Sequence, residues 1–165
     1  MSRILLGTIC VLIYGALGGC GIFDHCPSDN ALIERFRAHE ADFRRLAQMF
    51  KEDVKLSGVD HKTAWIDYDI KANLPQPRLD EYRRLMQKLG VQHIARGEPS
   101  GRFYLLVWRQ NSVFIGGSSK FYIYADWLPP PSPLRDSLDA LEQSGHDAYA
   151  FRKFEESWYL HLDIW

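Results

Sequence analysis

The sequence predicts an α+β fold, in which amphipathic helices pack on an antiparallel β-sheet. Apolar residues recur at three- and four-residue steps between residues 31 and 55, which is the period of a helix. From residue 91 the pattern changes to an alternation rich in β-branched and aromatic residues, which is typical of strands. The 165 residues are 46% hydrophobic and 25% charged, as in globular chains that bury a core of their own.

The first predicted element is a long N-terminal amphipathic helix over residues 31–55. Asp29 or Asn30 can cap its start, because a short polar side chain accepts hydrogen bonds from the free N–H groups there. Ser57 and Gly58 are expected to end it. An aromatic stripe at this spacing indicates core packing rather than a cofactor site. The stripe consists of Leu32, Ile33, Phe36, Phe43, Leu46, Met49, Phe50 and Val54.

A short strand and a second helix follow. The segment "TAWIDYDI", residues 63–70, alternates imperfectly and is predicted to be a strand before the prolines at 75 and 77. The segment "PRLDEYRRLMQKLG", residues 77–90, predicts a helix that packs on the sheet and ends at Gly90. Its apolar face consists of Leu79, Tyr82, Leu85, Met86 and Leu89.

The remaining elements are predicted to be three strands, a short third helix and a C-terminal hairpin. The segments "VQHIAR", "RFYLLVWR" and "SVFIGGSSKFYIYA" are expected to form an antiparallel meander. Ser132 can cap a short helix that starts at Pro133, carries Leu134, Leu138 and Leu141, and closes at Gly145. In the hairpin, Trp158, Leu160, Leu162 and Ile164 alternate with polar or amphipathic residues, so one face is expected to be buried.

Residues 1–19 are typical of a secretory signal, with Arg3 before an apolar run and small residues before a cleavage point. An uncleaved membrane anchor is the alternative, because the uncharged stretch 4–23 is long enough to span a bilayer. Five glycines between residues 7 and 21 weaken that alternative.

The segment Leu17-Gly18-Gly19-Cys20 resembles the lipobox of bacterial lipoproteins, which has a branched apolar residue, two small ones and a cysteine. This resemblance implies diacylglycerol on the Cys20 thiol, cleavage before Cys20 and acylation of the new amino terminus. It divides the chain into a signal peptide (1–19), a lipid-anchored leader (20–30) and a single domain (31–165). Lipid on Cys20 would hold the protein on the periplasmic face of a bacterial membrane. Gly21 in place of aspartate favours the outer membrane, as in enterobacterial lipoproteins.

Three further motifs resemble a group of uncharacterised bacterial lipoproteins. They are an "LxxLG"-like segment at 85–90, a "GSSKGYxY"-like segment at 117–124 and "WYL" at 158–160. Phe121 stands where the second motif has glycine. The resemblance implies the fold and the location and brings no activity with it.

The candidate binding residues are Ser118, Ser119 and Lys120 in "GGSSK", which lacks the spacing of a phosphate-binding loop and is predicted to be a hairpin turn. Ser118 or Ser119 with His161 and Asp163 has the composition of a catalytic triad, but no nucleophile elbow is present, so we expect no enzymatic activity. The six histidines lack ligand spacing, so no metal or cofactor is expected. A formal charge of −1 predicts no nucleic-acid partner.

The expected function is a non-catalytic binding or structural module of the cell envelope, whose aromatic sheet face holds an envelope protein or a glycan. The alternative is an inhibitor of an envelope-attacking hydrolase, which would insert a loop of residues 117–120 into an active site.

Cys26 is left without an intramolecular partner. It is expected to be an inert thiol in the leader, with an intermolecular disulfide or a reactive thiol as alternatives.

Overall fold

The computed structural model describes residues 25–61, 64–66, 74–97, 101–112, 116–126, 128, 133–144 and 146–165. Its helices and strands confirm the predicted α+β class. Cys20 and the predicted signal peptide lie outside the described residues. The elements are α1 (Asp29–Ala38), α2 (Glu40–Glu52), β1 (Leu56–Asp60), β2 (Ala64–Ile66), α3 (Gln76–Leu89), β3 (His93–Gly97), β4 (Arg102–Ser112), β5 (Gly116–Tyr124), α4 (Asp139–Ser144), β6 (Ala148–Glu155) and β7 (Trp158–Ile164).

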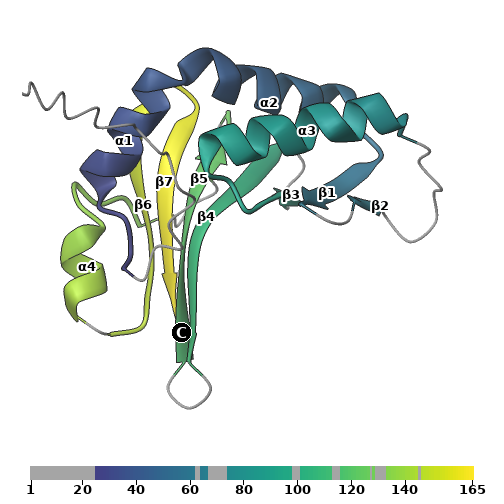
Figure 1. The fold of residues 1–165 in the computed structure, drawn as a ribbon. Coiled ribbons are helices and arrows are strands. Elements are labelled where there is room, and N and C mark those ends of the chain that lie inside the picture. The colour runs from purple at the N-terminus through teal and green to yellow at the C-terminus, as the bar shows by residue number, and fades with distance from the viewer. Residues whose placement is uncertain are drawn as a thin grey trace, which may run out of the picture.

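The seven strands form one sheet in the order β2-β1-β3-β4-β5-β7-β6, and all neighbours are antiparallel. Strands β3, β4 and β5 are consecutive in the sheet as well as in the sequence, which confirms the predicted meander. Strand β7 lies between β5 and β6. Helices α1, α2 and α3 lie across one face of the sheet, and α4 lies beside β6 (Figure 1). This arrangement gives the sheet a helix-covered side, which holds the main core.

Aromatic rings fill the centre of that core. The Phe36 ring lies 5.0 Å from Trp158, and the Phe43 ring lies 4.7 Å from Tyr122. The Tyr122 hydroxyl donates a hydrogen bond of 2.6 Å to the Leu32 carbonyl, so the polar end of this buried ring is satisfied. The first helical segment and the last strand are therefore joined through one packed cluster.

The predicted long N-terminal helix is wrong in one respect, because it is broken at His39. That residue has φ −131° and ψ 26°, and its N–H donates to the carbonyls of Arg35 and Phe36. The rings of Phe36 and Phe43 lie 5.1 Å apart across the break. The change of direction lets both helices follow the curved sheet (Figure 1).

The predicted ends of this helical region also need correction. Ser28, rather than Asp29 or Asn30, is the N-cap, and its hydroxyl accepts a hydrogen bond of 3.2 Å from the Ala31 N–H. Helix α2 ends at Glu52, and Val54 is 71% exposed instead of buried on the stripe. The predicted helix stop at residues 57–58 lies inside β1, which is held between β2 and β3.

The predicted third helix is shorter than expected, because α4 begins only at Asp139. Leu134 instead forms a parallel bridge with Phe151 at the edge of β6. The Arg135 N–H donates to the Phe151 carbonyl, and the Phe151 N–H donates to the Pro133 carbonyl, at 2.8 and 3.0 Å. These bonds to a sheet edge replace the helical ones that the sequence predicts. Of the predicted strand 63–70, Ala64–Ile66 forms β2, and the remaining positions lie outside the described residues.

Candidate functional site

The three predicted binding residues lie inside a strand, so the prediction of a loop or turn at residues 117–120 is wrong. Ser118, Ser119 and Lys120 belong to β5, which pairs with β4 on one side and with β7 on the other. Lys120 is completely buried and Ser119 is nearly so. Glycine and serine are typical of turns, but here two neighbouring strands satisfy the backbone of the segment.

Lys120 lies at the centre of a buried group of charges. Its Nζ lies 2.7 Å from Asp29 Oδ1 and 2.8 Å from Asp139 Oδ1. It also donates a hydrogen bond of 2.9 Å to the Pro27 carbonyl. Arg152 Nη1 donates to Asp29 Oδ2 at 3.0 Å. We call Asp29, Lys120, Asp139 and Arg152 the Lys120 cluster, in which two cations balance two carboxylates.

Asp29 and Asp139 are the first residues of α1 and α4, and each carboxylate caps the other helix. The Asp139 oxygens accept hydrogen bonds of 2.9 and 3.1 Å from the Asp29 N–H. Asp29 Oδ2 accepts a hydrogen bond of 2.7 Å from the N–H of Leu138, directly before α4. Negative charge is favourable at a helix N-terminus, where backbone N–H groups lack partners within the helix. The cluster therefore ties the starts of both helices to β5 and β6.

Asp29 and Lys120, the two fully buried groups of the cluster, keep their charges. Burial alone raises the pKa of Asp29, but the hydrogen bonds from Lys120 and Leu138 outweigh it and hold this pKa below its usual value. Burial lowers the pKa of Lys120, but the hydrogen bonds to Asp139 and Asp29 outweigh it and raise this pKa. A lysine that stays protonated offers no lone pair for attack or for proton abstraction. This chemistry favours a clamp that fixes the segment before α1 to the sheet.

Cys26 stands beside this clamp. Burial raises the pKa of its thiol to about 12, against the opposing effect of Lys120. Thiol–disulfide exchange and nucleophilic attack both need the thiolate. The raised pKa therefore favours the inert thiol over the two alternatives.

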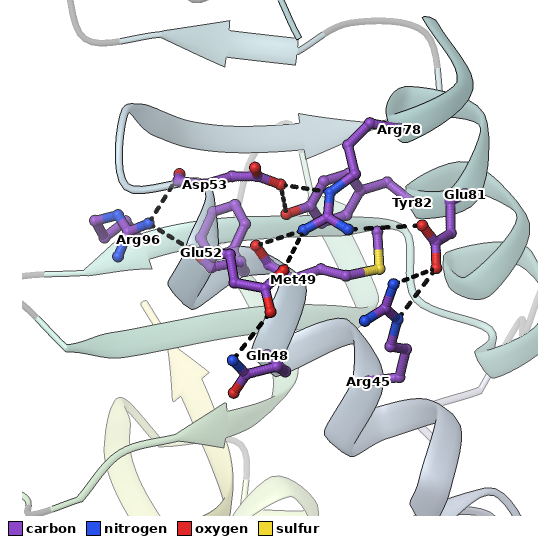
Figure 2. A network of polar contacts seen from close by, with 10 residues as sticks. Arg45, Gln48, Met49, Glu52, Asp53, Arg78, Glu81, Tyr82 and Arg96 are labelled. Atoms are coloured by element: carbon purple, nitrogen blue, oxygen red, sulfur yellow. Dashed lines mark hydrogen bonds and ion pairs between the residues drawn. The ribbon is translucent and has the colours of Figure 1, made fainter. Parts of the chain in front are cut away.

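A second polar network lies at the end of α2, as Figure 2 shows. The Arg78 guanidinium donates hydrogen bonds of 2.9 Å to Asp53 Oδ2 and 2.8 Å to Glu52 Oε2. From β3, Arg96 donates a hydrogen bond of 2.8 Å to the Phe50 carbonyl. The last carbonyls of a helix lack partners within it and attract cations, so the network closes this helix end.

Tyr82 completes that network from α3. Its hydroxyl donates a hydrogen bond of 2.7 Å to Asp53 Oδ2. Burial and this hydrogen bond raise the pKa of Tyr82, so the phenol stays protonated. The whole network is explained by the packing of α3 against α2.

Ser119, His161 and Asp163 do not form a triad. The Ser119 hydroxyl accepts a hydrogen bond of 3.2 Å from Arg109 Nε. His161 lies opposite Phe121 in the sheet register, and its Nδ1 is 3.0 Å from the Ala150 carbonyl. Because a carbonyl only accepts, Nδ1 carries the proton. Ser119 and His161 therefore each bond to a group outside the predicted triad.

The sheet side that faces away from α1–α3 carries a second cluster of rings. The His161 ring stacks on Phe151 at 4.5 Å and on Phe121 at 5.5 Å. The Tyr104 ring meets Phe121 edge-on at 6.1 Å, and Lys153 Nζ lies 5.8 Å from the centre of the Tyr159 ring. We call Tyr104, Phe121, Phe151, Tyr159 and His161 the aromatic face. The sequence predicts an aromatic sheet face in general terms. The signal for its position was the ring at 121 in one strand and the rings at alternate positions 159 and 161 in another.

The described residues contain no group of three or more His, Cys, Asp or Glu side chains that could hold a metal ion. None of their helices is both long and apolar enough to cross a membrane. Comparison with protein-family models, with curated proteins and with solved structures found no match. The function is therefore inferred from the residues of this chain alone.

The buried His161 predicts a dependence of stability on pH. Burial lowers its pKa from 6.5 to about 4, although the bond to Ala150 opposes the shift. Between these values the unfolded chain binds a proton that the folded chain does not, so stability falls as the pH falls. The loss due to this residue is expected to reach about 3 kcal/mol near pH 4. Urea denaturation at several pH values between 7.5 and 4.5 measures it.

The matched variants are His161→Phe, which keeps a stacking ring, and His146→Gln, which changes an exposed histidine. The first is expected to make the pH dependence shallower, although His93, whose pKa burial also lowers, still contributes to it, and the second is expected to leave it unchanged. A slope in His161→Phe as steep as in the parent chain would contradict this account.

Proposed function

We propose that the protein is a lipid-anchored lipoprotein of a bacterial cell envelope that serves as a non-catalytic binding or structural module. The observation that carries the proposal is the short stretch of chain between the lipobox-like segment and the clamp. Pro27, whose carbonyl accepts from the buried Lys120, comes seven positions after Cys20. An extended chain of that length spans at most about 25 Å. A domain on so short a leader works beside the membrane that holds it, and we place it on the periplasmic face of the outer membrane.

The aromatic face supports the binding role. Phe151, Tyr159 and His161 are buried and hold the partly exposed Tyr104 and Phe121 in place, so these two rings lose little conformational freedom when a ligand packs on them. Rings of this kind offer apolar contact to a protein surface or to the faces of sugar rings. Tyr104 and Phe121 remain partly exposed among them, and the exposed Lys153 lies at the rim. The partner we propose is an envelope protein or a glycan.

The inhibitor alternative is not retained. It depends on an exposed loop at residues 117–120, whereas these residues form part of β5. Lys120, which would enter the target's active site, is buried among its ion pairs.

The anchor is tested by Cys20→Ser. This variant is expected to lose acylation and to keep its apolar N-terminal segment, because the thiol is the acceptor of the lipid. Metabolic labelling with a palmitate analogue and the size of the product measure both effects. Cys26→Ser is the matched control, and it is expected to be labelled and processed normally. Label that persists on Cys20→Ser would overturn the lipoprotein assignment.

The binding role is tested by photo-crosslinking from two exposed lysine positions. A photoreactive side chain at Lys153 sits at the rim of the aromatic face, and one at Lys55 follows α2. In living cells, the Lys153 position is expected to yield crosslinks to an envelope component that the Lys55 position does not yield. Identical crosslinking patterns from the two positions would contradict a binding role for the aromatic face.

A further inference from the structure

We propose that one end of the sheet rests on the bilayer that holds Cys20, and that Leu134, Tyr149 and Trp165 touch its lipid there. We call these three residues the membrane-contact end. The inference rests on the proposed function and adds an orientation and a lipid-binding surface to it.

The exposed apolar side chains of the described residues gather at this end. The large ones are Leu134, Tyr149 and Trp165, which are 54%, 51% and 50% exposed, and Val54. Val54 follows α2, and the C-terminal end of this helix lies on the side of the molecule away from α4 and the end of β7 (Figure 1). Three of the four exposed side chains therefore belong to one part of the surface.

Backbone pairing places Trp165 and Tyr149 next to each other. Trp165 follows β7 and exchanges backbone hydrogen bonds of 2.8 and 3.0 Å with Gly117. A Cβ on Gly117 would lie 2.7 Å from the Trp165 ring, so the ring lies directly over this glycine. Tyr149 pairs with Asp163, two residues before Trp165. In an antiparallel sheet such positions lie on the same face.

Leu134 extends the same row at the sheet edge. It bridges to Phe151, two residues beyond Tyr149 along β6. Paired residues of neighbouring strands point to the same face, so Leu134 and Tyr149 are both on the face that carries Trp165. The three side chains thus come from three neighbouring segments of the sheet.

The leader joins the domain at the same end. Lys120, which holds the Pro27 carbonyl, lies three residues from Gly117 along β5, a distance of about 10 Å at the rise of a strand. Cys20 lies within about 25 Å of Pro27, because seven residues of extended chain span no more. Lys120 points to the helix-covered face, since it pairs with the core residue Leu162, so Pro27 and Trp165 lie on opposite faces near the same end of β5. This end of the sheet is therefore within reach of a bilayer that holds Cys20.

The chemistry of the three side chains fits the boundary between headgroups and acyl chains. Tryptophan and tyrosine concentrate at this depth, because one end of each ring is apolar and the other is polar. The charged neighbours Arg135, Asp136, Asp147 and Asp163 include one cation and three carboxylates, so this end has no excess of positive charge. The contact is therefore expected to need no anionic lipid and to persist when the salt concentration is raised.

Fluorescence quenching by brominated lipid tests the contact. The protein is purified from bacterial membranes, its intact mass shows whether Cys20 is acylated, and it is reconstituted into phosphatidylcholine vesicles with brominated acyl chains. Total tryptophan emission is expected to fall by about one fifth, the share of one tryptophan among five. Trp165→Phe is expected to lose this quenching.

The matched control is the double variant Val54→Trp/Trp165→Phe, whose exposed tryptophan is at position 54 instead of position 165. It is expected to remain unquenched. Absence of quenching by Trp165, or equal quenching from position 54, would overturn the proposed orientation. Shielding of Trp165 that depends on protein density rather than on lipid would assign this end to a second copy of the chain, and would also overturn it.

The mass measurement keeps the two proposals separate. A chain without acyl groups contradicts the lipoprotein assignment alone. If its mass shows that segment 4–23 is still present, this uncharged segment is long enough to hold it in the bilayer, and the quenching still tests the contact.

Discussion

Asp29→Ala is expected to lower the free energy of unfolding by about 3–5 kcal/mol, which is typical when one partner of a buried ion pair is removed. Lys120 would then face one carboxylate, that of Asp139, where the native cluster gives it two, and Arg152 would lose its ion pair with Asp29. The Leu138 N–H would lose its acceptor as well. Denaturation in urea measures the effect.

Two further variants show whether the loss comes from an uncompensated charge. Asp29→Leu combined with Lys120→Met removes one charge of each sign and is expected to recover much of the stability, because the two fully buried charges are removed together. Glu40→Ala breaks an exposed ion pair, in which Arg44 Nε lies 2.7 Å from Glu40 Oε1. It is expected to lower the free energy of unfolding by less than about 1 kcal/mol. Equal losses for Asp29→Ala and Glu40→Ala would refute the role of the Lys120 cluster.

Phe43→Ala is expected to cost about 3–5 kcal/mol, the range for removing a buried ring from a packed core. The ring is fully buried and lies 5.1 Å from Phe36, 4.7 Å from Tyr122 and 5.9 Å from Trp158. Its loss would leave a cavity between the two N-terminal helices and the centre of the sheet. Thermal and urea denaturation both measure the change.

The neighbouring Arg44 supplies the matched control. Its side chain is half exposed, and Arg44→Ala is expected to cost less than about 0.5 kcal/mol. Leu46→Ala, on the buried side of α2, is expected to cost about 2–5 kcal/mol. Similar losses for all three variants would mean that α2 does not pack on the sheet as described.

Periodicity was sufficient to predict the fold class, because helix and strand spacing are local properties of the chain. It also placed the end of α3 at Gly90, whose φ of 66° glycine adopts without strain. The break at His39 could not be predicted in this way, since neither glycine nor proline marks it. That break follows the curvature of a sheet formed by residues far away in the sequence.

The sequence shows that Asp29 and Lys120 are charges at apolar positions, but periodicity does not show that they belong to one cluster. Asp29 lies on the stripe of Leu32, Ile33 and Phe36, and Lys120 lies in the buried alternation of β5. Each is a charge at an apolar position, which predicts a partner without naming it. Asp29 is 110 residues from Asp139 and 123 from Arg152, so only the three-dimensional structure brings them together.

The loop at residues 117–120 was predicted from composition, which is shared by turns and by some strands. Gly117 is needed here because the Trp165 ring covers it, and Ser119 lies between Arg109 and Asp163 in the register. Neither reason is visible before the strand order is known.

If the chain is exported as we propose, the reciprocal capping of α1 and α4 sets an order of events. The start of α1 would acquire its partners Lys120, Asp139 and Arg152 only after nearly the whole chain had crossed the membrane. Contacts at such long separations form late, because the intervening chain must first be ordered. The leader would therefore stay free of the domain throughout translocation. An enzyme that processes Cys20 would meet an extended substrate, and the clamp would close only once the chain has been released.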